Sequence, residues 1–214
     1  MITNEQEASA FVADRCDATA MERLEALSAA LRKENQRQNL VSAASLDHMW
    51  QRHIADSAQL LDHVPRETVA GELWMDLGAG AGFPGLVIAS MWPEVRVLLV
   101  ESRKRRIEWL ESMIECLGLA RCSVAGTRLE MLEATPARVI SARAFAPLEK
   151  LLRLSARFST ADTCWVLPKG RSAALELQDV SGKWQKVFHV EQSATDPEAA
   201  ILVGTGTVKG KGAK

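Results

Sequence analysis

Hydrophobic positions in the first part of the chain recur at the spacing of amphipathic helices. Leu24 and Leu31 lie on one such stripe, in a helix that we expect to start at a Thr19–Glu22 capping box. A further helix is expected after a cap at Ser45. The pattern therefore predicts that residues 1–70 form a helical extension that caps the region after it.

From residue 72 the pattern changes to short apolar runs that alternate with turns and helical stretches. These runs have the length and composition of buried parallel strands: ELWMDL, RVLLVE, CSVAG, RVISA and CWVLP. Together they predict a doubly wound α/β sheet, a Rossmann-like fold. Near the end, WQKVFHVEQ and AILVGTGTV have no helix between them. We expect an antiparallel pair of strands at one edge of the sheet.

Composition narrows the class of protein. With 214 residues, 47% hydrophobic and 25% charged, the chain 1–214 is expected to form one globular domain. The four cysteines form no CxxC pair and the histidines do not complete a ligand set, so no metal site is expected. No apolar run is long enough to span a membrane and no secretory signal is evident, which indicates a cytoplasmic protein.

A glycine-rich turn follows the first predicted strand, in the stretch WMDLGAGAGFPG at residues 74–85. Glycine lets a ligand approach the main chain, so four glycines in one turn indicate binding. A phosphate-binding P-loop is excluded because no Lys follows the glycines. A dinucleotide fingerprint can be drawn through Gly80, Gly82 and Gly85, with Glu101 placed for a ribose. An NAD-type oxidoreductase is therefore one possible interpretation.

The same turn also matches DxGxGxG from Asp76 to Gly82, the turn that class I methyltransferases use for S-adenosylmethionine. This cofactor has no pyrophosphate, and its charged end favours an acidic residue such as Asp76 beside the turn. Glu101 ends the second strand, where its carboxylate could accept both ribose hydroxyls. The chain also lacks the separate substrate domain that a dehydrogenase usually carries. S-adenosylmethionine is therefore the favoured cofactor, with Asp76, Gly80 and Glu101 as candidate contacts.

Four stretches in order resemble the RsmG (GidB) family of bacterial ribosomal RNA methyltransferases. They are the glycine turn, RHIADS with the preceding Asn39-Leu40, KRRIEWL and ARAFAPL. The resemblance runs from about Asn39 to Gly170, and it implies methylation of N7 of guanine 527 in 16S ribosomal RNA. It also implies a set of cofactor contacts: Gly78, Phe83, Leu129, Glu130 and Arg143. Without the resemblance, the residues do not distinguish this function from that of a methyltransferase that acts on another RNA.

Guanine N7 carries a free lone pair, so its methylation needs no general base. The chain has no evident His/Asp pair or paired carboxylates for base catalysis, and we expect no catalytic acid or base. The rate enhancement would come from alignment of the reacting atoms. Arg143 is a candidate for orienting the cofactor or the guanine edge. Arg52 and His53 fit equally well a structural anchor of the helical extension and a substrate role.

The RNA contacts are expected where basic residues meet the ligand-binding edge of the sheet. The net charge of −1 does not by itself indicate nucleic acid, so local clusters must provide the contacts. The candidates follow the second and fifth strands: Lys104, Arg105, Arg106, Lys169 and Arg171. For Lys104, Arg105 and Arg106, the alternative to RNA binding is a helix face that is simply solvated. A weaker cluster at Lys209, Lys211 and Lys214 ends the chain. We expect a monomer that acts on the small ribosomal subunit or its assembly intermediate.

Overall fold

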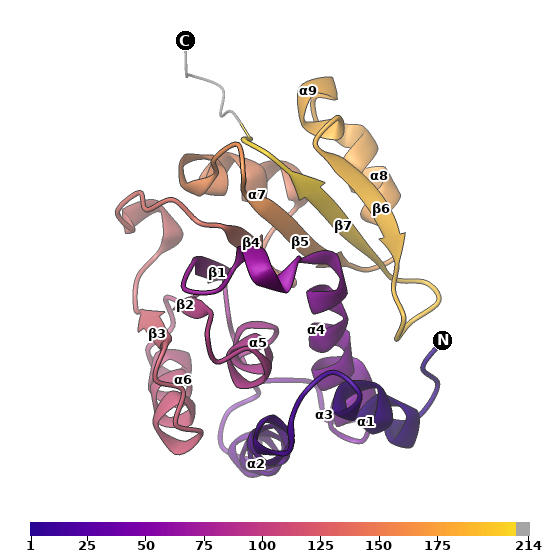
Figure 1. The fold of residues 1–214 in the computed structure, drawn as a ribbon, viewed down its shortest axis with the longest axis vertical. Helices are drawn as coiled ribbons and strands as arrows, with labels where there is room; N and C mark the ends of the chain where they lie inside the picture. Colours follow the sequence, from indigo (N-terminus) through magenta and orange to yellow (C-terminus); the bar gives the residue numbers. More distant parts are fainter. Residues whose placement is uncertain (209–214) are drawn as a thin grey trace.

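The computed structural model describes residues 1–208, which form a seven-stranded sheet with helices on both faces (Figure 1). The strand order is β3-β2-β1-β4-β5-β7-β6. The first five strands in that order pair in parallel, and β7 runs antiparallel to both β5 and β6. The doubly wound sheet and the antiparallel pair predicted from the sequence are confirmed. The strands are β1 Leu73–Leu77, β2 Arg96–Val100, β3 Cys122–Ala125, β4 Val139–Ser141, β5 Cys164–Lys169, β6 Phe188–Gln192 and β7 Ala200–Thr205.

Helices connect the strands and fill the N-terminal part of the chain. The α-helices are α1 Glu5–Ala13, α2 Ala18–Glu34, α3 Ala43–Leu46, α4 Asp56–Ala58, α5 Gly85–Met91, α6 Lys104–Cys116, α7 Leu148–Ser155, α8 Ala173–Asp179 and α9 Gly182–Gln185. Shorter or irregular helices complete the set. They are η1 Trp50–Ala55, η2 Gln59–His63, η3 Arg66–Thr68, η4 Leu129–Met131 and η5 Ala156–Phe158.

The two faces of the sheet bury two separate apolar cores. Alternate residues of each central strand point to opposite faces, so that Trp74 joins one core and Met75 the other. The first core packs the N-terminal helices, α5 and α6 against the sheet, and the second packs α7 and α8 (Figure 1). Leu24 and Leu31 are fully buried in the first core. The N-terminal helices therefore cover the same face as α5.

Two helix starts differ from the sequence prediction. Helix α2 begins two residues earlier than the Thr19–Glu22 capping box implies, because the Asp17 carboxylate accepts a hydrogen bond from the Ala20 amide at 2.8 Å. The next helix is capped by Ser42 rather than Ser45, and it is short. After it the chain continues as η1, a π-helix, instead of one regular α-helix.

Within residues 1–208, no helix is both long and apolar enough to cross a membrane. The tail lysines Lys209, Lys211 and Lys214 lie outside the described residues.

Candidate active site

The four glycines of the turn after β1 are required for different structural reasons. A Cβ on Gly85 would lie 2.2 Å from Leu99 Cδ2, and one on Gly82 would lie 2.3 Å from Leu86 Cδ1. These two glycines are required by packing within the protein. Gly78 and Gly80 have φ of +69° and +58°, and the nearest atom to a Cβ on Gly80 is 3.4 Å away. Gly82 also has a positive φ, of +103°, and a Cβ on Gly78 would lie 2.5 Å from Phe145 Cδ2, so only Gly80 of the four combines a positive φ with room for a ligand.

Asp76 lies below the turn instead of facing a ligand. Its side chain is fully buried, and its two oxygens accept hydrogen bonds from the Gly85 amide at 3.0 Å and the Ser141 hydroxyl at 2.9 Å. Burial raises the pKa of this carboxyl to about 6, although both hydrogen bonds oppose the rise. Because both oxygens are engaged within the protein, the direct ligand contact predicted for Asp76 is not supported. Its carboxylate instead joins β1, β4 and the start of α5.

Glu101, directly after β2, supports the turn from the opposite side. One carboxylate oxygen accepts a hydrogen bond from the Gly80 amide at 3.1 Å, and the other accepts from the amides of Ser102 and Arg103. Arg106 lies 3.9 Å from the first oxygen. The carboxylate is 6% exposed and lines a cavity, so its remaining acceptor capacity is available to a ligand.

This smaller cavity has a volume of about 350 Å³ and lies at the carboxyl ends of the first three strands. It brings together four of the predicted cofactor contacts: Gly78, Glu101, Leu129 and Glu130. Its lining combines backbone groups of a glycine turn, a carboxylate and the buried apolar side chain of Leu129. Such a lining fits a nucleoside, because a carboxylate can accept from ribose hydroxyls and an apolar side chain can pack on a base.

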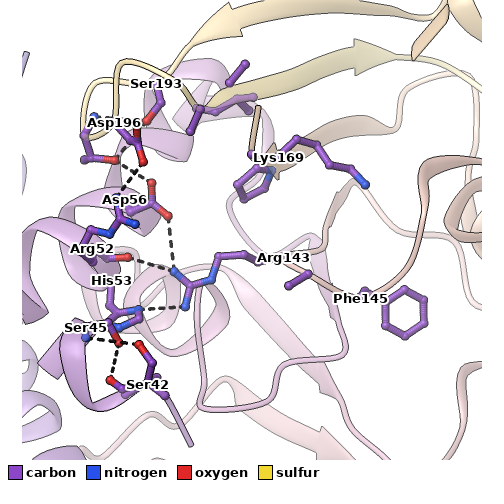
Figure 2. A pocket seen from close by; sticks show the side chains of 18 of the residues that line it. Ser42, Ser45, Arg52, His53, Asp56, Arg143, Phe145, Lys169, Ser193 and Asp196 are labelled. Carbon is purple, nitrogen blue, oxygen red and sulfur yellow. Dashed lines mark hydrogen bonds and ion pairs between the residues drawn. The ribbon is translucent and has the colours of Figure 1, made fainter. Parts of the chain in front are cut away.

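A larger cavity of about 1060 Å³ lies next to it, beyond the ends of β4 and β5 (Figure 2). The residues that line it come from α3 and its cap, η1, α4, the β4–α7 loop, β5, α8, the β6–β7 loop and β7. The polar and charged members are Ser42, Ser45, Arg52, His53, Asp56, Arg143, Lys169, Glu176, Ser193, Thr195 and Asp196. Three carboxylates and three cations balance the charge of this wall.

The two cavities share one wall, formed by Ala144, Phe145 and Ala146. Ala144 has a φ of +52°, the only positive value at a non-glycine residue among residues 1–208. The ring of Phe145 lies over Gly78, where an added Cβ would be 2.5 Å from Phe145 Cδ2. One short segment of the loop after β4 therefore lies between the two cavities.

Arg143, predicted as a cofactor contact, lines the larger cavity and not the smaller one. Its Nη1 donates to the Arg52 carbonyl at 3.2 Å and to Asp56 Oδ2 at 3.4 Å, and its Nη2 lies 3.1 Å from His53 Nδ1 (Figure 2). Its Nε–H has no hydrogen-bond partner within residues 1–208. The two sequence stretches RHIADS and ARAFAPL, far apart in the chain, meet at this guanidinium.

Phe83 is buried behind Arg143 and lines neither cavity. Its ring stacks on His53 with centroids 4.9 Å apart, and the Arg143 guanidinium carbon lies 5.2 Å from the ring centroid. The cofactor contact predicted for Phe83 is therefore not supported by its position. Phe83 instead supports the residues that face the larger cavity.

Arg52 and His53, for which the sequence left a structural and a substrate role open, lie between the helical extension and the larger cavity. Arg52 forms an ion pair with Asp196 at 2.7 Å, which ties η1 to the β6–β7 loop. His53 is 7% exposed, and burial, followed by the charges of Arg143 and Arg52, lowers its pKa to about 3. Both residues anchor the helical extension, and both line the larger cavity.

The five predicted RNA contacts lie in different environments. Lys104 and Arg105 are exposed at the start of α6, while Arg106 turns into the smaller cavity beside Glu101. Lys169 is only 10% exposed and forms an ion pair with Glu176 at 2.8 Å. Arg171 is exposed and pairs with Glu198. Two of the five, Arg106 and Lys169, are thus engaged inside cavities.

Several residues of the two cavities were not predicted from the sequence. Arg128 and Lys150 are exposed beside the smaller cavity, and Asp56 lines the larger one, where it contacts Arg143 and Thr195. The position of Arg128 just after β3 could have indicated it, since the carboxyl ends of parallel strands meet at one edge. Asp56 lies within the RHIADS stretch, but nothing in its local spacing indicates a cavity residue.

The strand order, the single reversed strand β7 and the glycine turn followed by an acid after β2 define the fold of a class I methyltransferase. A solved structure, that of a mutant of MtNAS in complex with S-adenosylmethionine, shares this fold. The structural alignment has a TM-score of 0.58 and 17% sequence identity, and it covers 95% of this chain and 84% of that chain.

The model of the GidB family, rRNA small subunit methyltransferase G, matches residues 20–199. A ribosomal RNA small subunit methyltransferase G from Erythrobacter litoralis is 72% identical over 209 residues, covering 98% of this chain and 100% of that protein. Another from Rhizorhabdus wittichii is 54% identical over 217 residues, covering 100% of this chain and 99% of that protein.

This chain therefore belongs to the rRNA small subunit methyltransferase G family. The resemblance drawn from the sequence and the prediction of an S-adenosylmethionine-dependent methyltransferase are confirmed. The dinucleotide-dependent oxidoreductase is no longer supported.

Proposed function

We propose that this chain methylates N7 of guanine 527 in 16S ribosomal RNA, with the cofactor in the smaller cavity and the target base in the larger one. The observation that carries this proposal is the shared wall of Ala144, Phe145 and Ala146. Groups bound in the two cavities can meet across a segment of three residues. The choice of nucleotide rests on the family to which the chain belongs.

Five of the predicted contacts would hold the cofactor: Gly78, Glu101, Leu129 and Glu130, which line the smaller cavity, and Gly80, whose amide donates to Glu101. The Glu101 carboxylate accepts from ribose hydroxyls, Leu129 packs against the adenine, and the main chain at Gly78 and Gly80 allows close approach. Glu130 stands at the rim. When bound, S-adenosylmethionine supplies an electrophilic methyl group on a sulfonium. Asp76 contributes indirectly, because it holds the turn against β4.

The larger cavity provides no free base, which agrees with methylation of a nitrogen that already has a lone pair. Each of its carboxylates is paired with a cation: Asp56 with Arg143, Glu176 with Lys169, and Asp196 with Arg52. The balanced charge suits a neutral base better than a phosphate. The contribution of the chain to the rate is then alignment of the base. Arg143 is suited to this task, since its Nε–H is available to a base oxygen such as guanine O6.

The exposed basic residues around the smaller cavity are proposed to contact RNA phosphates. They come from α6, the loop after β3 and α7: Arg103, Lys104, Arg105, Arg128 and Lys150. Arg171 lies on the side of the larger cavity, after β5. The ends of β2 and β5 are three strand spacings apart, roughly 14 Å. One RNA strand could therefore span both groups.

We further propose that the chain acts as a single-domain monomer and prefers the assembled or partly assembled small subunit. The exposed basic cluster is small, so naked RNA would be held weakly at physiological salt. In the subunit, the target loop is already shaped. Methylation of small subunits at a higher rate than of free 16S RNA, by a protein that elutes as a monomer in light scattering, is the expected result.

Mapping of N7-methylguanine tests the function directly. Unmodified small subunits are incubated with the protein and S-adenosylmethionine, and the RNA is cleaved after borohydride and aniline treatment. Reverse transcription should stop next to guanine 527, and the stop should be absent without the cofactor or when that guanine is replaced by adenine. A new stop at another guanine would reject the proposed site, and no stop in any RNA would reject the proposed reaction.

A further inference from the structure

His53 lies at the centre of the contacts that hold Arg143. It belongs to the π-helix η1, lines the larger cavity and is 7% exposed. Its ring is nearly parallel to that of Phe83, with an interplanar angle of 20°. Its Nδ1 faces Arg143 Nη2 at 3.1 Å (Figure 2).

The tautomer of His53 follows from its partner. A guanidinium has only N–H donors, so Nδ1 of His53 must be the acceptor and the proton of the neutral ring must lie on Nε2. That Nε2 is buried and has no hydrogen-bond partner within residues 1–208. An unpaired buried donor lowers stability. A ring required only for stacking on Phe83 would be served better by phenylalanine, so the acceptor at Nδ1 has a use of its own.

Among residues 1–208, Arg143 has three acceptors, and the contact with His53 is the shortest. The Arg52 carbonyl lies at 3.2 Å and Asp56 Oδ2 at 3.4 Å. Asp56 is also engaged elsewhere, because its other oxygen accepts from Thr195 at 2.7 Å and from Gln59 at 2.9 Å. His53 alone contacts Nη2, so it sets the plane in which the guanidinium lies.

We infer that His53 is a positioning residue: as a neutral hydrogen-bond acceptor it orients Arg143 toward the target base. This inference rests on the proposed function, in which Arg143 acts on that base. The charged groups that act on His53 are the cations Arg143 and Arg52, and Arg143 is in turn paired with the Asp56 carboxylate. A protonated ring would lose its acceptor and repel Arg143, whereas the neutral ring keeps the contact.

Three substitutions separate positioning from packing. In His53→Asn the amide oxygen can replace Nδ1 as acceptor, in His53→Gln it would lie near the Nε2 position, and His53→Phe keeps the stack on Phe83 without an acceptor. We expect kcat within about threefold of wild type for the Asn variant, and about 100-fold losses for the Gln and Phe variants. Binding of adenosylhomocysteine should be unchanged in all three. His189→Asn, on exposed β6, is the matched control and should behave as wild type.

Equal activity of His53→Phe and wild type would overturn the inference, as would an Asn variant that folds normally and is as impaired as the Phe variant. Folding is checked by thermal unfolding. If the variants do not fold, nitrogen NMR of the wild-type histidine rings decides instead: a proton on Nε2 supports the inference, and one on Nδ1 overturns it. A wild-type protein that fails to methylate small subunits would reject the proposed function itself, independently of the tautomer.

Discussion

The two cavities are built from parts of the chain at very different separations. In the glycine turn beside the smaller one, the Asp76–Gly85 contact joins residues 9 positions apart and the Glu101–Gly80 contact joins residues 21 apart. In the larger one, Arg143 contacts the Arg52 carbonyl 91 positions away, and the Thr195 hydroxyl contacts Asp56 139 positions away. The smaller cavity is therefore part of the folding unit around β1 and β2, while the larger one depends on long-range polar contacts.

This difference predicts different outcomes for substitutions. Changes in the turn around the smaller cavity should affect the fold or the cofactor, because the same residues pack the sheet. Changes in the larger cavity should affect the substrate step and leave cofactor binding intact. The following variants test that separation.

The largest effect is expected for Gly85→Ala. The new Cβ would meet Leu99 Cδ2 at 2.2 Å and Asp76 Oδ2 at 2.8 Å in a packed core, which should lower the free energy of unfolding by about 3 kcal/mol. Gly80→Ala meets nothing closer than 3.4 Å, and its positive φ should cost only about 1 kcal/mol. Urea unfolding measures the free energy of unfolding of both alanine variants.

A bulky residue at Gly80 should leave the protein folded but abolish cofactor binding. Similar losses of stability in the two alanine variants would contradict this division of the glycines.

Next is Arg143→Ala, which should lower methylation of small subunits about 100-fold because the base is no longer aligned. Its affinity for adenosylhomocysteine should stay close to wild type, since Arg143 lines only the larger cavity. In Glu101→Gln it is the affinity for adenosylhomocysteine that should fall, about tenfold, because the ribose hydroxyls lose a charged acceptor. Calorimetric titration and methyl transfer are measured on the same preparations. Loss of cofactor affinity in Arg143→Ala would place this residue in the smaller cavity after all.

A pH effect on stability is expected from His53. Its pKa falls from 6.5 to about 3 on folding, so the unfolded chain takes up a proton below pH 6.5 that the folded chain does not. Stability from this group is present above pH 6.5 and is lost as the pH falls toward 3. Between pH 8 and pH 5 the wild type should lose about 2 kcal/mol more than His53→Asn. Parallel urea titrations at the two pH values give the difference, and identical losses would show that His53 is not buried as a neutral ring.

The smallest effect is expected for the double reversal Lys104→Glu and Arg105→Glu. Loss of two phosphate contacts should reduce methylation of small subunits roughly tenfold at low salt and less at high salt. Adenosylhomocysteine affinity should not change, because both side chains point to solvent. Lys183→Glu with Lys186→Glu, exposed at and just after α9, makes the same change of net charge and serves as the control. Equal behaviour of the two double variants would leave the start of α6 as a solvated face.

Much of the smaller cavity could be predicted because its residues stand next to strands that the apolar pattern already predicts. Gly78, Glu101, Leu129 and Glu130 all lie together at one edge of the sheet, as expected. The inward turn of Asp76 could not be predicted, since it depends on Ser141, 65 positions away. Periodicity says on which strand a carboxylate lies but not which hydrogen-bond donors the neighbouring strand offers.

The larger cavity was mostly beyond prediction for the same reason. Family resemblance singles out Arg143, but its place beside His53 requires the helical extension to dock against the β4–α7 loop. The π-helix that presents Arg52 and His53 leaves no recognisable signature in the apolar spacing. The start of α2 differs from the prediction because Asp17 and Thr19 are both good caps and only the tertiary packing selects between them.

The most direct test of the two-cavity account is a crystal structure of the protein with adenosylhomocysteine. The account predicts the adenosyl group in the smaller cavity, with its ribose on Glu101 and its adenine against Leu129, and the larger cavity left open to the base. An adenosyl group bound in the larger cavity, against Arg143 and Lys169, would contradict it.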